Sequence, residues 1–343
     1  MSEQIKISDK PFVGVFDSGL GGISVLAELI NKMPHMDFAY FGDSANAPYG
    51  TKNPDFVIAR AEEICSNFVY RGARAIVIAC NTATSVAAGK LREKYRIPII
   101  GMEPAVKPAL AYLEEQRANK KIAVLATPMT LKENKYRQLV RTLNAESKVV
   151  EIPSPELVEL VEGSFFHEEK VRKMIAAYIR NRIDTVSDIG AIVLGCTHFV
   201  FLKKYFEEYC EGLKVFDGNA GTANRLSELL KNADEEENFS RNNERGQVHI
   251  DNSAGAEKIE LSKKLLWHEL NKEEYSLVEG EIQRFVGAEL NEEEAELAKL
   301  YYTEKMSIHQ IARQTGKKER QLQDIFHAMN ARLFRHLKKT DTK

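Results

Sequence analysis

Short apolar runs alternate with longer helical patterns through the first two hundred residues, and this alternation constrains the fold more than any other feature. Strands that are joined by helices predict parallel β–α–β units with helices on both faces of the sheet. Two sets of such units follow one another, which makes the expected fold class α/β. The first set has predicted strands at 12–18, 37–44, 73–81 and 97–102, with helices at 23–33, 56–72 and 84–95. The second has strands at 121–128, 148–154 and 191–199, with helices at 131–144 and 168–183.

The two sets share a short pattern that contains a cysteine. The segments AIVIACNTAT (75–84) and AIVLGCTHFV (191–200) both pass from an apolar strand to a cysteine and a threonine. Ligands of open parallel sheets bind at the carboxyl ends of the strands, where these two cysteines fall. The chain is therefore a candidate internal duplication with one such cysteine in each half. Cys65 and Cys210 lie within helical patterns and are interpreted as packing residues.

Several chemistries are compatible with the two strand-end thiols, Cys80 and Cys196. A disulfide is possible, although the C-x-x-C spacing of redox motifs is absent. A zinc site would need four ligands, and the histidines do not cluster near either cysteine. Covalent catalysis needs one nucleophile rather than two. Two thiols on opposite sides of a small molecule suit general acid–base catalysis, in which one removes a proton and the other delivers one.

Each thiol needs help to act as a base, because a free cysteine has a pKa of about 8.5. Asp17 could accept a proton near Cys80, and His198 could do so near Cys196. The alternative is that Asp17 is a turn or helix-cap residue and that His198 is a hydrogen-bonded structural residue.

A glycine-rich turn, DSGLGG (17–22), opens the helix that follows the first strand. Its backbone N–H groups at a helix N-terminus could bind a carboxylate or a phosphate. The G-x-G-x-x-G spacing of dinucleotide sites is not met. The turn Pro48-Tyr49-Gly50 could also hold an anion, or it is a plain turn.

Composition is that of an ordinary globular protein, with 43% hydrophobic and 29% charged residues. The net charge of −2 gives no overall attraction to nucleic acid or membrane. The polar N-terminus lacks the apolar region of a secretion signal, and no apolar run is long enough to span a bilayer. Four cysteines at varied spacing do not form a disulfide framework. We therefore expect a cytoplasmic protein with free thiols and no membrane association.

Five motifs in this order resemble glutamate racemases of the aspartate/glutamate racemase group. The motifs are VFDSGLGG (15–22), YFGDSANAPYG (40–50), ACNTATS (79–85), GMEPAVKPA (101–109) and LGCTHF (194–199). The resemblance is strong over residues 10–230 and fades by about 280. It implies interconversion of L- and D-glutamate without cofactor or metal, which supplies D-glutamate for peptidoglycan synthesis. Aspartate racemase is the alternative within this enzyme class.

The resemblance also implies which residues form the site. Cys80 and Cys196 resemble the family's catalytic pair, assisted by Asp17 and His198, and Glu162 matches an acidic residue near the site. The substrate-contacting set would be Asp17, Ser18, Tyr49, Gly50, Asn81, Thr82, Glu162, Thr197 and His198. The chain departs from the family at Phe199-Val200, often Tyr-Pro, and at Ser154, often Cys. These departures leave the proton-transfer groups intact.

The family fold implies two similar α/β domains with the active site between them, in a protein that we expect to be a homodimer. Residues 10–105 and 215–283 would form a discontinuous first domain, and residues 106–214 the second. The segment DGNAGTANRL (217–226) resembles the return to the first domain. The polar, acidic stretch 232–247 is expected to be an exposed loop.

Residues 284–343 extend beyond the usual family length and predict three helices. Asn291 with Glu294 resembles a capping box, Ser307 could cap a second helix that ends at Gly316, and an apolar stripe marks the third. The order is similar to the helix-turn-helix of sigma-factor region four. Residues 305–343 hold 10 Lys and Arg against 3 Asp and Glu, a charge of +7. DNA contacts are expected from Lys317, Lys318, Arg320 and Gln323; the alternative is a helical bundle with a solvated basic face.

Overall fold

The computed structural model describes residues 11–164, 168–234, 246–270, 290–303 and 308–340. These residues divide into two compact units. The first runs to Gly163 and continues over Arg172–Leu270; the second comprises Ser164–Val171 and Asn271–Lys343.

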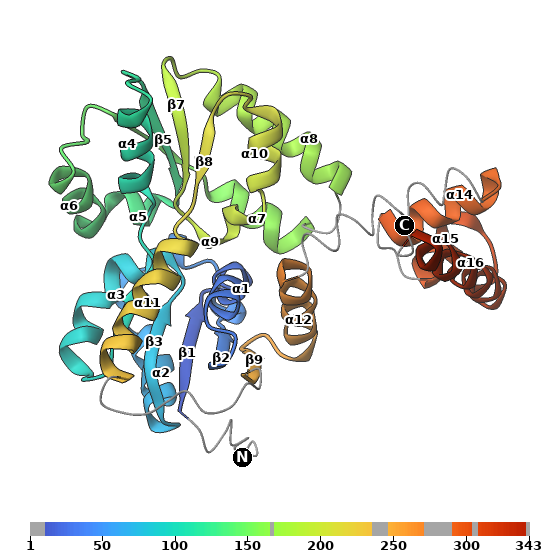
Figure 1. The fold of residues 1–343 in the computed structure, drawn as a ribbon, viewed down its shortest axis with the longest axis horizontal. Coiled ribbons are helices and arrows are strands. Elements are labelled where there is room, and N and C mark those ends of the chain that lie inside the picture. The colour runs from blue at the N-terminus through green and yellow to red at the C-terminus, as the bar shows by residue number, and fades with distance from the viewer. Residues whose placement is uncertain (1–10, 165–167, 235–245, 271–289, 304–307, 341–343) are drawn as a thin grey trace. The chain divides into compact units, whose positions relative to one another are not determined.

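Two parallel sheets form the frame of the first unit (Figure 1). The first sheet has the order β4-β3-β1-β2-β9, and the second has the order β6-β5-β7-β8. The strands of the first sheet are β1 (Phe12–Asp17), β2 (Asp37–Gly42), β3 (Ala73–Ile78), β4 (Ile99–Gly101) and β9 (Val248–Asn252). Those of the second are β5 (Lys121–Ala126), β6 (Val149–Pro153), β7 (Ile189–Leu194) and β8 (Lys214–Phe216).

The two sheets repeat one topology, as the shared cysteine pattern predicts. From its other edge, the second sheet has the strand order 8-7-5-6. This is the order 4-3-1-2 of the first sheet with four added to each strand number. Even an irregularity recurs: the pairing of β1 with β3 shifts register between Phe12 and Val13, and that of β5 with β7 shifts between Lys121 and Ile122. The strands β3 and β7, which precede Cys80 and Cys196, are therefore equivalent.

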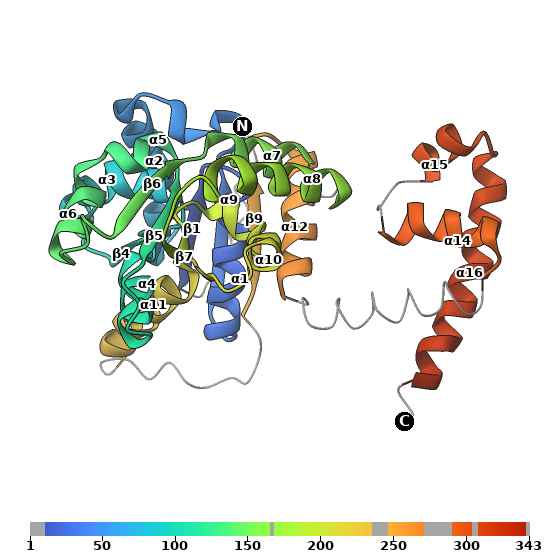
Figure 2. The ribbon, with the colours of Figure 1, turned by 90° about the horizontal axis from the view of Figure 1, so that it is seen from above.

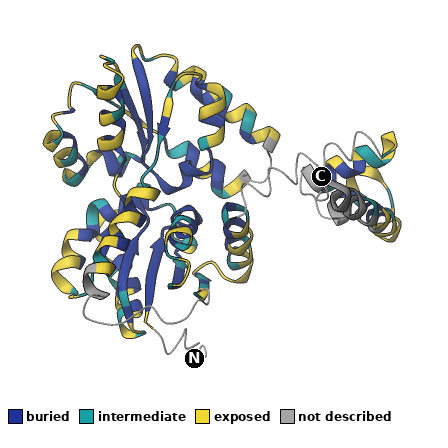
Figure 3. Ribbon diagram, viewed as in Figure 1, coloured by how far each residue is buried: buried dark blue, intermediate teal, exposed yellow. Residues whose placement is uncertain are grey.

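Helices cover the strands, whose central members are buried throughout (Figure 3). On one face of the first sheet, α2 and α3 pack through Phe68, Leu91 and their neighbours into the core with Phe16 and Ile76. The helix α1 lies against α11 and α12. The helices are α1 (Ile23–Lys32), α2 (Pro54–Tyr70), α3 (Asn81–Lys94), α4 (Val106–Glu115), α5 (Pro128–Lys132), α6 (Asn134–Thr142), α7 (Pro155–Ser164), α8 (Glu168–Tyr178), α9 (Thr197–Val200), α10 (Lys203–Tyr209), α11 (Asn219–Asp234) and α12 (Ala256–Leu270). Short helical turns occur at η1 (Ser44–Asn46), η2 (Tyr49–Thr51) and η3 (Ile179–Ile183).

Two predicted strand ends are wrong for one physical reason, which is that polar strand-end residues start helices rather than extend strands. The predicted strand 191–199 ends at Leu194, and Cys196 precedes α9. The predicted strand 73–81 ends at Ile78, because the Cys80 sulfur caps α3. The predicted helix 131–144 is two helices, α5 and α6, which meet at the extended residue Glu133.

The segment after the second sheet contains structure that the sequence patterns did not reveal. The strand β9 pairs with β2, with Ile250 opposite Tyr40. The helix α11 reaches Asp234, and the rest of the expected loop, 235–245, lies outside the described residues. The predicted domain boundaries stay predictions. The boundary predicted between residues 214 and 215 falls within β8, a strand that pairs with β7.

None of the helices within the described residues is both long enough and apolar enough to cross a bilayer.

The second unit contains the helices α14 (Glu292–Ala298), α15 (Ile308–Thr315) and α16 (Glu319–Thr340), with a π-helical turn η4 (Lys299–Thr303). Asn291 and Glu294 form the predicted capping box. Gly316, with φ 72°, follows α15, and residues 316–318 lead into α16, the long last helix in Figure 2. The predicted cap Ser307 lies outside the described residues. The core is made of Leu297, Ala298, Leu300, Ile311, Leu322, Phe326 and Met329.

Leu322 is 0% exposed in this small core, so Leu322→Ala should lower the free energy of opening of α14 and α16 by about 2–5 kcal/mol. Native-state hydrogen exchange measures this for each segment. The exposed neighbour Gln321→Ala is the matched control, and amides of β1 and β5 should keep their protection in both variants. Unchanged exchange in α14 and α16 of Leu322→Ala would contradict this packing.

Candidate active site

Both predicted cysteines lie at equivalent strand ends and are buried, free thiols. Cys80 follows β3 and Cys196 follows β7. Burial raises the pKa of Cys80 to about 12, and negative charge on Asp17 and on Cys196 acts in the same direction. The two thiols are therefore close enough for the charge of one to affect the other.

Cys80 sits at the N-terminus of α3, a helix of 14 residues. The backbone N–H of Ala83 donates to its sulfur at 3.4 Å, and the sulfur lies 3.6 Å from the Ser18 hydroxyl oxygen. Both contacts lower the pKa of Cys80 and so oppose the effect of burial. A helix N-terminus favours a thiolate for the same electrostatic reason.

Asp17 is 0% exposed and joins the two halves of the unit. Its carboxylate accepts from the Gly19 N–H at 2.9 Å and from the Thr197 hydroxyl at 3.0 Å. Burial raises its pKa, while a positive charge on His198 and these hydrogen bonds oppose the rise. Asp17 affects Cys80 through its charge, while its carboxylate oxygens bond to Gly19 and Thr197.

His198 is the partner of Cys196. Its Nδ1 lies 3.8 Å from the cysteine sulfur, and its Nε2 lies 2.8 Å from Glu162 Oε1. The ring is 2% exposed, and burial lowers its pKa. The interactions with Cys196 and Glu162 outweigh burial and raise the pKa of His198 well above its ordinary value. The protonated form of the His198 ring is therefore favoured.

Glu162, on α7, is bound on both oxygens. Oε1 accepts from the Leu20 N–H at 2.9 Å as well as from His198, and Oε2 accepts from Lys258 Nζ at 2.8 Å. Burial raises its pKa, but these donors overcome burial and hold the pKa at about 2. Lys258, on α12, belongs to no sequence motif, and only tertiary structure places it here.

The glycine-rich turn serves close packing rather than an open anion cradle. A Cβ on Gly21 would lie 2.3 Å from the Thr197 hydroxyl oxygen and 2.7 Å from His198 Nδ1. Glycine is needed there because any side chain would push the two strand ends apart. The expected anion-binding N–H groups of Gly19 and Leu20 already donate to Asp17 and Glu162.

The remaining predicted contacts lie near Asp43, which belongs to the motif at 40–50, and near Thr127, which the sequence did not single out. The Tyr49 hydroxyl donates to Asp43 at 2.6 Å. The Thr82 and Thr127 hydroxyls are 2.9 Å apart, and a Cβ on Gly50 would lie 2.7 Å from Thr127 Cβ. Thr127 follows β5 as Ser18 follows β1, so the internal duplication was a signal that could have found it.

The two departures from the family pattern are buried packing residues. Ser154 donates to the Ile152 carbonyl at 2.8 Å, and its hydroxyl lies 2.5 Å from that of Tyr178. Phe199 is 0% exposed.

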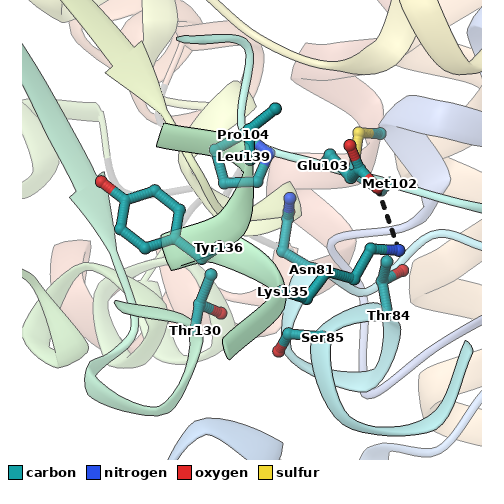
Figure 4. A pocket seen from close by; sticks show the side chains of 10 residues that line it. All are labelled: Asn81, Thr84, Ser85, Met102, Glu103, Pro104, Thr130, Lys135, Tyr136 and Leu139. Atoms are coloured by element: carbon teal, nitrogen blue, oxygen red, sulfur yellow. Dashed lines mark ion pairs between the residues drawn. The ribbon is translucent and has the colours of Figure 1, made fainter. Parts of the chain in front are cut away.

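A small pocket lies beside Asn81, and Lys135 forms an ion pair of 3.0 Å with Glu103 at its wall (Figure 4). Of the predicted substrate contacts, only Asn81 lines it, so we do not assign the substrate to this pocket. The lining residues are Asn81, Thr84, Ser85, Met102, Glu103, Pro104, Thr130, Lys135, Tyr136 and Leu139.

Metal ligands do not cluster within the described residues: no group of three or more His, Cys, Asp or Glu side chains there could hold an ion.

Comparison with known proteins matches part of the chain to a family. The family described as Asp/Glu/Hydantoin racemase matches residues 23–226, more than half of the chain. The chain belongs to this family. It is therefore a racemase, an isomerase.

Curated relatives and solved structures of this family resemble most of the chain. Glutamate racemase of Clostridium acetobutylicum is 42% identical over 258 residues, which cover 74% of this chain and 96% of the relative. Glutamate racemase of Bifidobacterium longum (strain DJO10A) is 43% identical over 261 residues, covering 74% and 97%. The Escherichia coli glutamate racemase, solved with L-glutamate and the activator UDP-MurNAc-Ala, is 30% identical with a TM-score of 0.65, covering 76% of this chain and 95% of that one. The Bacillus anthracis isoform RacE1 is 26% identical with a TM-score of 0.64, covering 76% and 95%.

Glu162→Gln should destabilise the first unit by about 3 kcal/mol at pH 7, because it leaves Lys258 and His198 without their shared carboxylate. The pKa of Glu162 in the folded chain, about 2, is below its ordinary value of 4.5. Its contribution is therefore fully present above pH 4.5 and is lost as the pH falls toward 2.

Denaturant unfolding of wild type and variant at pH 7, 4.5 and 3 measures this difference. The exposed Glu159→Gln on the same helix is the control. A difference that does not shrink between pH 4.5 and 3 would contradict the assigned role of the charge.

Proposed function

We propose that the protein is a glutamate racemase that interconverts L- and D-glutamate with Cys80 and Cys196 as its two acid–base groups. The observation that carries this proposal is the pair of buried thiols at equivalent strand ends, each with a different polar partner. The printed activity of the curated relatives supports glutamate as the substrate.

The reaction needs one thiolate and one thiol on opposite faces of the substrate α-carbon. The thiolate removes the α-proton, and the thiol protonates the other face of the resulting carbanion. In the reverse direction the two cysteines exchange roles. No cofactor is needed for these two proton transfers.

The partners prepare the thiols by different means. Asp17, whose pKa burial raises, can hold the proton that Cys80 loses. His198, whose protonated ring lies beside Glu162, places its Nδ1 3.8 Å from the Cys196 sulfur and can exchange a proton with it. Burial raises the pKa of Cys80, and a cationic substrate ammonium close to the sulfur would favour its thiolate.

Substrate contacts are proposed for Ser18, Asn81, Thr82 and Thr197, whose hydroxyl and amide groups suit two carboxylates and an ammonium. The proposed set is completed by Asp17, Tyr49, Gly50, Glu162 and His198. As the family resemblance implies, D-glutamate would be used for peptidoglycan synthesis in the cytoplasm, by an enzyme that acts as a homodimer.

Purified protein should produce D-glutamate from L-glutamate without added cofactor, and chiral chromatography measures the product. Cys80→Ala and Cys196→Ala should each lower kcat by about 10²–10⁴-fold, because each removes one acid–base group. Cys65→Ala, at a buried cysteine outside the site, is the control and should keep its activity. Full activity in either catalytic variant would exclude the two-base mechanism.

Selectivity is tested by kcat/KM for glutamate and aspartate. A larger value for aspartate would assign the chain to aspartate racemisation, the alternative within this class.

We further propose that residues 284–343 bind DNA. The helices α15 and α16 are joined by the three residues 316–318, a length and a glycine that are typical of helix-turn-helix motifs. Lys318, Arg320 and Gln323 are exposed at the start of α16, whereas Lys317 is ion-paired with Glu293. We therefore expect the first three to make the main contacts.

Full-length protein should bind duplex DNA with an affinity that falls steeply between 50 and 200 mM salt, as phosphate contacts require. The double variant Lys318→Glu/Arg320→Glu should bind more weakly and show a salt slope shallower by about 2. Fluorescence anisotropy measures both. Lys90→Glu/Lys107→Glu, at exposed lysines of the first unit, is the charge-matched control. Equal binding by the two double variants would refute DNA binding by this motif.

A further inference from the structure

A line of three side chains runs from α12 to Cys196. Lys258 Nζ lies 2.8 Å from Glu162 Oε2, and Glu162 Oε1 lies 2.8 Å from His198 Nε2. The other ring nitrogen, Nδ1, lies 3.8 Å from the Cys196 sulfur. Three helices, α12, α7 and α9, each supply one side chain to this line.

We propose that Lys258 is a positioning residue for racemisation, which holds the Glu162 carboxylate against His198 and thereby fixes the ring that serves Cys196. This inference rests on the proposed racemase function. It goes beyond it by giving a role to a residue that lies outside the family match at 23–226 and outside the five motifs.

Lys258 matters for Glu162 because the two carboxylate oxygens accept hydrogen bonds from different donors. Oε1 receives both the Leu20 N–H and His198, and Oε2 receives the Lys258 ammonium. The Glu162 side chain is 19% exposed, so water can compete for an oxygen that has lost its donor. A carboxylate released on the Oε2 side can rotate and weaken its hold on His198.

The orientation of His198 matters because one ring nitrogen sets what the other can do. When Nε2–H donates to a carboxylate, the ring plane is fixed and Nδ1 is aimed at its own partner. Here that partner is the Cys196 sulfur. Movement of Glu162 would therefore change proton transfer at Cys196 through the orientation of the His198 ring.

The effect should be confined to one side of the substrate. Cys80 is served by Ser18, Ala83 and Asp17 rather than by an imidazole. Lys258 should therefore affect α-proton exchange of the enantiomer that Cys196 deprotonates more than that of the enantiomer that Cys80 deprotonates. The losses in kcat/KM for racemisation must be equal in the two directions, because the equilibrium constant between enantiomers is one.

Lys258→Met tests this in full-length protein, with Lys258→Arg as the conservative variant. Lys264→Met, at an exposed lysine of the same helix, is the matched control. We expect Lys258→Met to lower kcat by about tenfold with KM within about threefold, the size of effect that supporting residues have. Arg should restore most of the activity, and Lys264→Met should behave as wild type.

Proton exchange in heavy water separates the two sides. In Lys258→Met, one enantiomer should exchange its α-proton faster than it racemises, because Cys80 still removes and returns it. The other enantiomer should lose exchange and racemisation together. Equal losses of α-proton exchange for both enantiomers, or wild-type kcat in Lys258→Met, would overturn the proposal.

An NMR measurement on the unliganded protein decides the role of Lys258 even if the chain racemises neither amino acid. The ring ¹⁵N signals of His198, assigned by their loss in His198→Asn, should move in Lys258→Met and Glu162→Gln. They should stay in place in Lys264→Met and return toward their wild-type positions in Lys258→Arg. Wild-type shifts in Lys258→Met would overturn the positioning role, whereas a failure of wild-type racemisation alone would overturn only the proposed function.

Discussion

The hydrogen bond from Thr197 to Asp17 is the interaction on which the rest of the site depends. It joins residues 180 positions apart, at the ends of β7 and β1, and one partner is a carboxylate without solvent exposure. A buried carboxylate is costly unless donors satisfy it, so this contact fixes how the two strand ends meet. Gly21 permits the approach, because a Cβ there would collide with Thr197.

The repeated topology places Cys80 and Cys196 at equivalent strand ends, but the side chains around the two thiols differ. Cys80 caps a long helix and has a hydroxyl and a carboxylate near it. Cys196 has an imidazole that is tied to Glu162 and, through it, to Lys258. A reaction that runs in both directions needs two groups of similar capacity. In the proposed two-base mechanism, the two cysteines would use different polar partners for this purpose.

The C-terminal segment differs from the rest of the chain in net charge. The segment 305–343 carries +7 within a chain of −2, so the preceding 304 residues carry −9. Some of the basic side chains of the second unit are used internally, as Lys317 with Glu293 and Arg332 with Glu294 show. The basic side chains that stay exposed at the start of α16 are the reason for proposing a ligand with phosphate groups.

The sequence by itself determined the α/β class, the duplication and the strand-end positions of Cys80 and Cys196, because periodicity and repeated motifs are local properties of the chain. It misplaced the ends of β3 and β7, since polar residues after a strand can either extend it or cap a helix. Only the tertiary structure decided that Lys258 reaches Glu162 and that the Gly19 and Leu20 amides are already occupied. Those contacts join residues far apart in the chain, and no local pattern encodes which distant side chain will satisfy a buried charge.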